Sequence, residues 1–227
     1  LSLRQKEYAY HLSEAAKLGR DITWDQYCKW NLPIRHVVED ILNEYEGDRE
    51  CADFQNFTVY AKRLFFANGI HHHYSEDKFF PECPKEYFQS LMEAVGDGEQ
   101  ATELLEVIYS PDIYPQRRST SKTGDIVELS AVNFYDGVTR EEVDKYYNSM
   151  MDPNDKTPIS YGLNTKVVKE DGKVVEKPWK VGGIYGPALE RICAELEKAA
   201  AVAETDLQKE AIGKLVEYYR TGDLKTW

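Results

Sequence analysis

The sequence has few of the features that mark membrane proteins or nucleic-acid binders. Its longest uninterrupted apolar run is Ala199–Ala203, far short of the roughly 20 residues that cross a bilayer. Lys and Arg number 28 against 40 Asp and Glu, which gives a net charge of -12. Because such a surface repels phosphate-rich partners, we expect no membrane and no nucleic acid among the partners.

Cysteine and proline are also scarce. The four cysteines, Cys28, Cys51, Cys83 and Cys193, contain no Cys-x-x-Cys pair, so neither a structural zinc site nor a disulfide framework fits their spacing. We therefore expect reduced thiols and a reducing compartment. Only 9 prolines and 42% hydrophobic residues are typical of a folded chain rather than a disordered or fibrous one.

Common catalytic motifs are missing as well. No histidine is followed by glutamate, so there is no HExxH helix, and there is no Gly-x-Ser-x-Gly segment and no phosphate-binding glycine loop. The segment 180–186 is a glycine-rich turn into a helix rather than a dinucleotide-binding motif. The chain thus offers no catalytic residue by motif.

Apolar periodicity predicts helices at both ends of the chain. In the first half we expect helices over 34–45, with Pro33 at the first position, over 54–65, ended by a left-handed Gly69, and near 85–94 and 100–109. A long irregular loop follows over 110–124. In the second half, stripes over 189–203 and 207–218 predict a helical pair.

The middle of the chain reads as the strand region. We expect a strand over 126–134, a helix from the Thr139/Glu142 capping box to about Met150, and a hairpin over 166–177 that turns at Asp171-Gly172. The predicted class is α+β, with helices flanking a small antiparallel β-sheet or barrel.

The two ends suggest a piece of a longer polypeptide. The chain starts at Leu1, and Ser2 already caps a helix with Gln5 as capping-box partner. It stops at the apolar Trp227, just after a helix end marked by Gly222. We expect a cytoplasmic protein, although an export signal could have been lost with the original N-terminus.

Three consecutive histidines, His71–His73, follow a predicted helix end and precede carboxylates. Imidazole is the commonest zinc ligand, but neighbouring strand residues point to opposite faces, so at most His71 and His73 converge. His11 and His36, on helices, have no evident reason to join them. The other interpretation is a polar groove lining or a hydrogen-bonded structural loop, and we predict no metal ligand.

Two further segments carry weaker indications. Arg117-Arg118 could meet an anion, although a solvated pair is the simpler interpretation, and Glu141-Glu142 suits a helix N-terminus. The segment 160–164, with Gly162 beside Tyr161 and Asn164, could let an extended peptide approach a strand edge. A strand start or bulge is the simpler interpretation.

The segment Asn68-Gly-Ile-His-His-His-Tyr-Ser75, followed by Lys78-Phe79 and Pro81, resembles bacterial dipeptidyl peptidase III. Further stretches agree in the same order over essentially the whole chain: 1–7, 133–139, 157–164, 168–173, 179–185 and 219–225. The family's HExxxH zinc helix has no counterpart here. The resemblance therefore implies that residues 1–227 are the N-terminal portion, mainly the lower lobe, of such an enzyme.

Members of this family are zinc exopeptidases that release dipeptides from peptide N-termini. The resemblance implies zinc in the parent enzyme, none bound by this chain, and the missing zinc-bearing lobe of the same polypeptide as a partner. It places Tyr74 in the substrate cleft, flanked by His73 and Ser75. With Asn68, Gly69, Tyr161 and Asn164, these form our predicted peptide-binding set.

On this interpretation the chain orients short peptides and is not active alone. Two alternatives stay open. One is a self-standing peptide- or protein-binding module without catalysis, and the other is a histidine-dependent metal binder.

Overall fold

The computed structural model describes residues 1–226 and divides into two compact units. The first unit comprises Leu1–Ile22 and Phe134–Trp227, and the second comprises Thr23–Asn133. The boundary falls within helix α2 (Arg20–Tyr27). Because each unit has its own core of buried side chains, we describe them separately.

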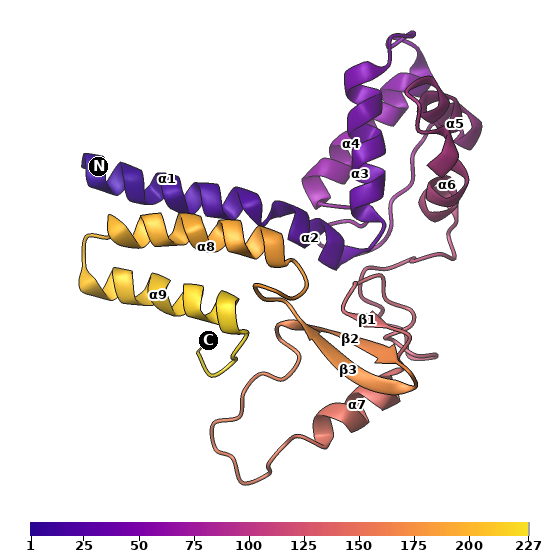
Figure 1. Ribbon diagram of the computed structural model, residues 1–227. Helices are drawn as coiled ribbons and strands as arrows, with labels where there is room; N and C mark the ends of the chain where they lie inside the picture. Colours follow the sequence, from indigo (N-terminus) through magenta and orange to yellow (C-terminus); the bar gives the residue numbers. More distant parts are fainter. Residues whose placement is uncertain (227) are drawn as a thin grey trace. The chain divides into compact units, whose positions relative to one another are not determined.

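Three long helices form the core of the first unit. Helix α1 (Leu3–Leu18) packs along α8 (Gly186–Ala201), and α8 packs along α9 (Asp206–Thr221) (Figure 1). Their shared core contains Leu189, Ile192, Cys193, Leu196 and Ala199, which are the positions of the predicted stripe. The predicted Ser2/Gln5 capping box is confirmed, and the Thr205 side chain caps α9 by accepting the Gln208 N–H.

The sheet of the first unit has the order β1 (Tyr135–Asp136), β2 (Thr165–Glu170), β3 (Lys173–Pro178). The predicted hairpin is confirmed, since β2 and β3 pair antiparallel and Asp171 and Gly172 turn with φ of 50° and 77°. Strand β1 pairs parallel to β2, so the sheet is mixed rather than wholly antiparallel. Helix α7 (Arg140–Asn148) begins at the predicted Thr139/Glu142 capping box.

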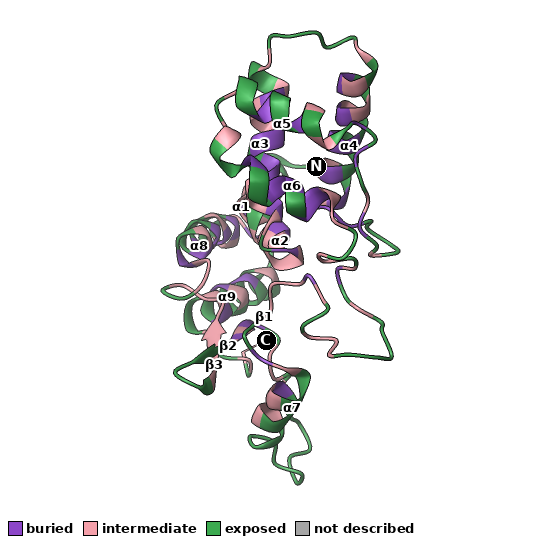
Figure 2. Ribbon diagram, turned by 90° about the vertical axis from the view of Figure 1, so that its right-hand side faces the viewer, coloured by how far each residue is buried: buried purple, intermediate pink, exposed green. Residues whose placement is uncertain are grey.

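The second unit is helical. It contains α3 (Asn31–Glu44), α4 (Ala52–Ala67), α5 (Lys85–Ala94), a 3-10 turn (Gly98–Gln100) and α6 (Ala101–Tyr109). Figure 2 shows buried residues on α3, α4, α5 and α6, with exposed residues on other sides of the same helices. Large side chains from these helices fill the core: Ile34, Ile41, Phe57, Tyr60, Leu64, Phe88, Leu91 and Ile108.

The strand predicted over 126–134 is wrong. The carboxylate of Asp125 accepts the Val127 N–H at 2.8 Å, and its carbonyl accepts the Leu129 N–H at 3.0 Å. The Ser130 hydroxyl then donates to the Ile126 carbonyl. Local side-chain bonds of this kind compete with strand ladders, so the segment folds as a turn and the strand begins only at Tyr135.

Two helix ends also differ from expectation. Helix α3 begins at Asn31, two residues before Pro33, so proline is its third residue rather than its first. At the end of α4 the left-handed C-cap is Asn68, with φ 56° and ψ 42°, whereas Gly69 has a φ of 146°. Asparagine tolerates the left-handed region better than other residues with a Cβ. The α+β class itself is confirmed.

Two phenylalanines of α4 give a matched test of the second core. Phe57 is fully buried and Phe66 is 73% exposed. We expect Phe57→Ala to lower the free energy of unfolding by about 3–5 kcal/mol, because it leaves a cavity among Phe54, Phe88 and their neighbours. Phe66→Ala should cost less than about 1 kcal/mol. Urea unfolding followed by tryptophan fluorescence measures both, and equal losses would contradict the core assignment.

Candidate functional site

The loop that carries the three histidines leaves α4 through a fixed polar junction. The Asn31 side chain accepts the Ile70 N–H at 3.2 Å and donates to the Asn68 carbonyl at 3.4 Å. A Cβ built on Gly69 would lie 2.2 Å from Nδ2 of Asn31, so no larger residue fits there. Asn68 and Gly69 thus set the direction in which the loop starts, and their contact with substrate stays a prediction.

The loop itself is a short hairpin over residues 70–79. The Phe79 N–H donates to the Ile70 carbonyl at 3.1 Å, and the His72 N–H donates to the Asp77 carbonyl at 2.8 Å. His71 and Lys78 pair between these two bonds. The tip is therefore the six-residue turn 72–77, closed by a further bond from the Glu76 N–H to the His72 carbonyl at 3.0 Å.

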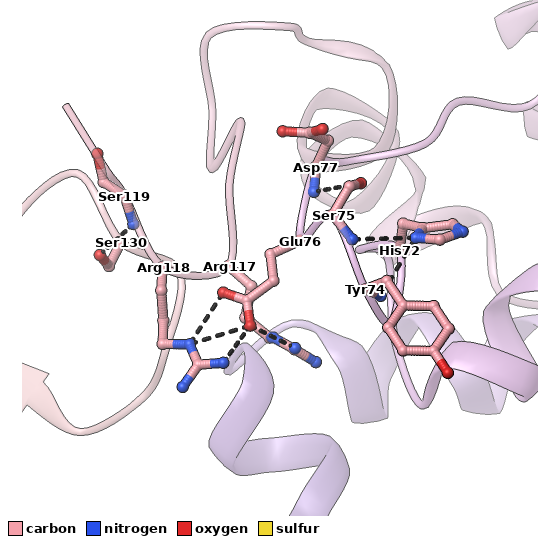
Figure 3. Close-up of polar contacts among 9 residues, drawn as sticks. All are labelled: His72, Tyr74, Ser75, Glu76, Asp77, Arg117, Arg118, Ser119 and Ser130. Carbon is pink, nitrogen blue, oxygen red and sulfur yellow. Dashed lines mark hydrogen bonds and ion pairs between the residues drawn. The ribbon is translucent and has the colours of Figure 1, made fainter.

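Glu76 ties this tip to the chain around residue 117. Its carboxylate accepts hydrogen bonds from the guanidinium groups of Arg117 and Arg118 (Figure 3), and its carbonyl accepts the Arg117 N–H at 2.9 Å. The bonds from Arg118 and Arg117 lower the pKa of Glu76 to about 2. The anion that the arginine pair meets is therefore a carboxylate of the chain itself.

The base of the hairpin is buried. The Lys78 ammonium donates to the carbonyls of Val107, Ser110 and Ile113 at the end of α6, where the helix dipole favours a cation. Burial lowers the pKa of Lys78 to about 8. Beside it, Nε2 of His71 lies 2.9 Å from the Tyr114 carbonyl, and burial lowers the pKa of His71 to about 4.

Beyond this base, the aromatic side chains of the tip are exposed. Tyr74 is 85% exposed, and its ring centroid lies 4.4 Å from that of His73. The His73 ring in turn meets Phe66 of α4 edge to face at 4.9 Å. A pocket of about 390 Å³ lies here, lined by Arg63, Phe66, Ala67, His72, His73 and Phe79. The hairpin thus presents Tyr74 to solvent beside a largely apolar pocket.

The predicted residues Tyr161 and Asn164 belong to the first unit. Both line a pocket of about 650 Å³ together with Tyr146 and Glu176. The Tyr161 hydroxyl donates to the Met150 carbonyl at 3.0 Å, and the Asn164 side chain, which is buried, donates to the Gly222 carbonyl at 2.9 Å. Asn164 therefore joins β2 to the end of α9, and the Tyr161 ring is available in the pocket wall.

The structure brings Asn68, Gly69, His73, Tyr74 and Ser75 together in one loop of the second unit. Sequence reasoning missed the residues that hold this loop, which are Asn31, Glu76 and Lys78. In the sequence, the segment Glu76-Asp77-Lys78 after Ser75 is distinguished only by its three charged side chains. Because its partners lie 29 to 42 residues away, no local pattern could have identified the pairing.

Residues 1–226 contain neither a cluster of metal ligands nor a helix that could cross a membrane. Among residues 1–226, no three His, Cys, Asp or Glu side chains are placed to hold a metal ion. His71 points to the Tyr114 carbonyl and His73 to Phe66, so the two do not converge. Within the same described range, no helix has both the length and the apolar character that a bilayer crossing requires.

Comparison with known proteins extends these observations. No family model matches the chain. Human dipeptidyl peptidase 3 is 24% identical to this chain over a matched region that covers 99% of this chain and 36% of that protein. Dipeptidyl peptidase III structures from Caldithrix abyssi and from Corallococcus sp. strain EGB cover 98% and 100% of this chain, each with a TM-score of 0.59, at 19% and 16% identity.

The resemblance to dipeptidyl peptidase III is confirmed. It extends over essentially the whole chain, in sequence and in fold, and it supports the expected likeness to the lower lobe. The chain spans about a third of the length of these proteins, at 36%, 32% and 32%. Neither the sequence nor the fold comparison tests the peptide-binding residues, which stay predictions.

Glu76 allows a test of how strongly the loop is held. Since its pKa is about 2 in the folded chain and higher when unfolded, its ion pairs stabilise the fold above about pH 4.5, and this stabilisation is lost as the pH falls toward 2. We expect Glu76→Gln to lower the free energy of unfolding by about 2 kcal/mol at pH 7. Urea unfolding at pH 7 and pH 3 should show the difference from wild type shrinking at acid pH.

The matched control is Glu46→Gln, which removes an exposed carboxylate in the same unit. It should change the unfolding free energy by less than about 0.5 kcal/mol. A Glu76→Gln effect as small as this, or one that stays constant with pH, would contradict the role given to the ion pairs.

Proposed function

We propose that this chain is the substrate-orienting, N-terminal and mainly lower-lobe portion of a zinc-dependent exopeptidase that releases dipeptides from peptide N-termini. Two findings support the proposal. The resemblance to dipeptidyl peptidase III covers 98–100% of the chain. The most specific motif of this resemblance, Asn68–Ser75, lies in a fixed hairpin with an exposed aromatic tip.

The exposure of Tyr74 on a firmly held loop is the observation that carries the proposal. An apolar ring that is 85% exposed has no role in the core of its own unit. Tyrosine offers a flat apolar face for a side chain and a hydroxyl for a peptide backbone group. Because backbone bonds and ion pairs fix the loop beneath it, Tyr74 can bind a peptide without first paying the entropy of ordering the loop.

His73 and Ser75 flank this contact. The His73 ring lies between the rings of Phe66 and Tyr74, so it extends the aromatic surface toward the pocket on α4. Ser75 is exposed, and its hydroxyl accepts the Asp77 N–H at 3.3 Å. In the first unit, Tyr161 is our proposed contact for an extended peptide along the start of β2, from the wall of that unit's own pocket.

The bond-breaking chemistry would belong to another part of the same polypeptide. A metallopeptidase needs a metal that polarises the scissile carbonyl and lowers the pKa of its water. The described residues do not offer a set of ligands for it, and the sequence has no HExxxH motif. Zinc would therefore be held by a separate zinc-bearing lobe, and this chain would supply only binding and orientation.

The charge of the chain suits this role. With a net charge of -12, its field attracts the ammonium group at a peptide N-terminus and repels nucleic acids and anionic membranes. Short peptides and the zinc-bearing lobe are the partners that we propose, in the cytoplasm.

A second candidate is a self-standing module that binds peptides without catalysis. The pocket of about 650 Å³ beside Tyr161 and Glu176 favours it, because that volume accommodates a peptide side chain and lies wholly within the first unit.

The first test uses the protein encoded by the complete reading frame, in which we expect an HExxxH motif after Trp227. Tyr74→Ala should raise KM for a short peptide about tenfold and change kcat less, because it removes binding shared by ground and transition states. Tyr10→Ala, at a 59% exposed tyrosine of α1, should change neither constant. A reading frame that ends at Trp227, or a Tyr74→Ala enzyme with unchanged KM, would contradict the proposal.

The second test uses the 227-residue chain alone. It should not hydrolyse peptides, whereas joining it covalently to the zinc-bearing lobe should restore dipeptide release that a chelator removes and zinc recovers. Calorimetry with short peptides separates the two candidates. Measurable binding to the isolated chain that Tyr161→Ala weakens and Tyr74→Ala leaves unchanged would favour the self-standing module, and the absence of any heat signal at millimolar peptide would discard it.

A further inference from the structure

The His72 side chain, unlike those of His71 and His73, forms hydrogen bonds to the backbone of its own turn. Its Nδ1 atom lies 3.2 Å from the backbone nitrogen of Tyr74 and 3.2 Å from that of Ser75, and it accepts hydrogen bonds from both N–H groups (Figure 3). The side chain therefore closes the turn 72–77 from within, in the way that Asn or Asp caps a turn or a helix N-terminus.

This geometry holds only for the neutral imidazole. A nitrogen that accepts N–H groups carries no proton, so the ring proton must sit on Nε2, and protonation at Nδ1 would turn the acceptor into a donor that faces two other donors. The two N–H groups would then lose their partner, and the ring would have to leave its position. Imidazoles are the side chains that ordinarily change charge between pH 8 and pH 5.

We propose that His72 is a positioning residue whose neutral ring holds the turn that presents Tyr74, and that it thereby makes peptide binding weaken at acid pH. The inference rests on the proposed function, because it takes Tyr74 as the group that meets the peptide. His72 touches the backbone of that residue rather than the peptide itself.

The other charged groups that face the loop tip keep their charge between pH 7 and pH 5. Bonds from Arg118 and Arg117 hold the pKa of Glu76 at about 2, and hydrogen bonds from Gln116 and Ser75 hold the pKa of Asp77 below its usual range. Arg63, which lines the neighbouring pocket from α4, stays cationic, as do the two arginines bound to Glu76.

At the base of the hairpin, burial keeps the pKa of His71 near 4 and that of Lys78 near 8, so neither changes charge appreciably in the same interval. His73 is the other imidazole at the tip, and its ring centroid lies 4.5 Å from that of His72. A test must therefore separate His72 from His73.

Asparagine provides that separation. Its side-chain oxygen is bonded to Cγ, as Nδ1 is in histidine, so it can accept hydrogen bonds from the same two N–H groups. The asparagine side chain does not titrate. His72→Asn should keep both N–H groups bonded at every pH, His72→Ala should leave them without this acceptor at every pH, and His73→Asn should keep the pH dependence because it leaves the cap intact.

The first measurement is amide hydrogen exchange by NMR on the 227-residue chain, corrected for the intrinsic pH dependence of exchange. In the wild type, protection of the Tyr74 and Ser75 amides should fall about three- to tenfold from pH 7 to pH 5. It should stay constant in His72→Asn and be absent throughout in His72→Ala. Protection that does not depend on pH in the wild type, or that falls equally in His72→Asn, would overturn the proposal.

The second measurement is the pH profile of KM in the protein from the complete reading frame. Between pH 7 and pH 5, KM should rise about three- to tenfold more in wild type and His73→Asn than in His72→Asn, while the kcat profiles of wild type and His72→Asn coincide. Identical KM profiles for wild type and His72→Asn would overturn the coupling to peptide binding.

The two measurements also separate this inference from the proposed function. If Tyr74→Ala leaves KM unchanged, the role of Tyr74 in binding fails, and with it the coupling. Amide exchange still decides whether His72 closes the turn, because that readout needs neither zinc nor a substrate.

Discussion

The presentation of Tyr74 depends on the ion pairs between Glu76 and the arginines at 117 and 118, more than 40 residues further along the chain. A hairpin of ten residues buries too little apolar surface to fix its own tip. Polar contacts that reach outside the hairpin replace that missing core. Lys78 holds the base against the end of α6, and Glu76 holds the tip against the segment around Arg117. The Arg117 guanidinium also lies over the Tyr27 ring at 4.1 Å, so the second partner is itself held in place.

The three histidines illustrate how position gives identical side chains different chemistry. His71 is buried, and its pKa is lowered to about 4. His72 accepts backbone N–H groups within the turn. His73 is exposed and its ring lies between two aromatic rings. The hydrogen-bonded structural loop that the sequence suggested accounts for the first two, and an aromatic surface beside a pocket accounts for the third. The three consecutive histidines therefore have three separate structural roles and do not form a cluster of metal ligands.

Residues with local partners could be predicted well. Helix α5 has its expected bounds, 85–94, and the capping boxes at Ser2 and Thr139 and the turn at Asp171-Gly172 form as their sequences indicate. The strand prediction for 126–134 was wrong for a local reason as well. The apolar pattern favoured a strand, but the Asp125 and Ser130 side chains form hydrogen bonds to the backbone that stabilise a turn. The peptide contact of Asn164 stays a prediction, and only the structure shows that its amide donates to the Gly222 carbonyl at the end of α9, a partner 58 residues away.

The sequence by itself determined the α+β class, the hairpin, the acidic charge and, through the motif at 68–75, the resemblance to dipeptidyl peptidase III. These features rest on periodicity, on turn chemistry over a few residues, or on the order of the letters. Only the tertiary structure decided that β1 joins β2 in parallel, that Lys78 is buried among carbonyls, and that the arginine pair binds Glu76. The reason is physical: each of these contacts joins segments far apart in the chain, and the charge or hydropathy of a side chain does not specify which distant partner it will meet.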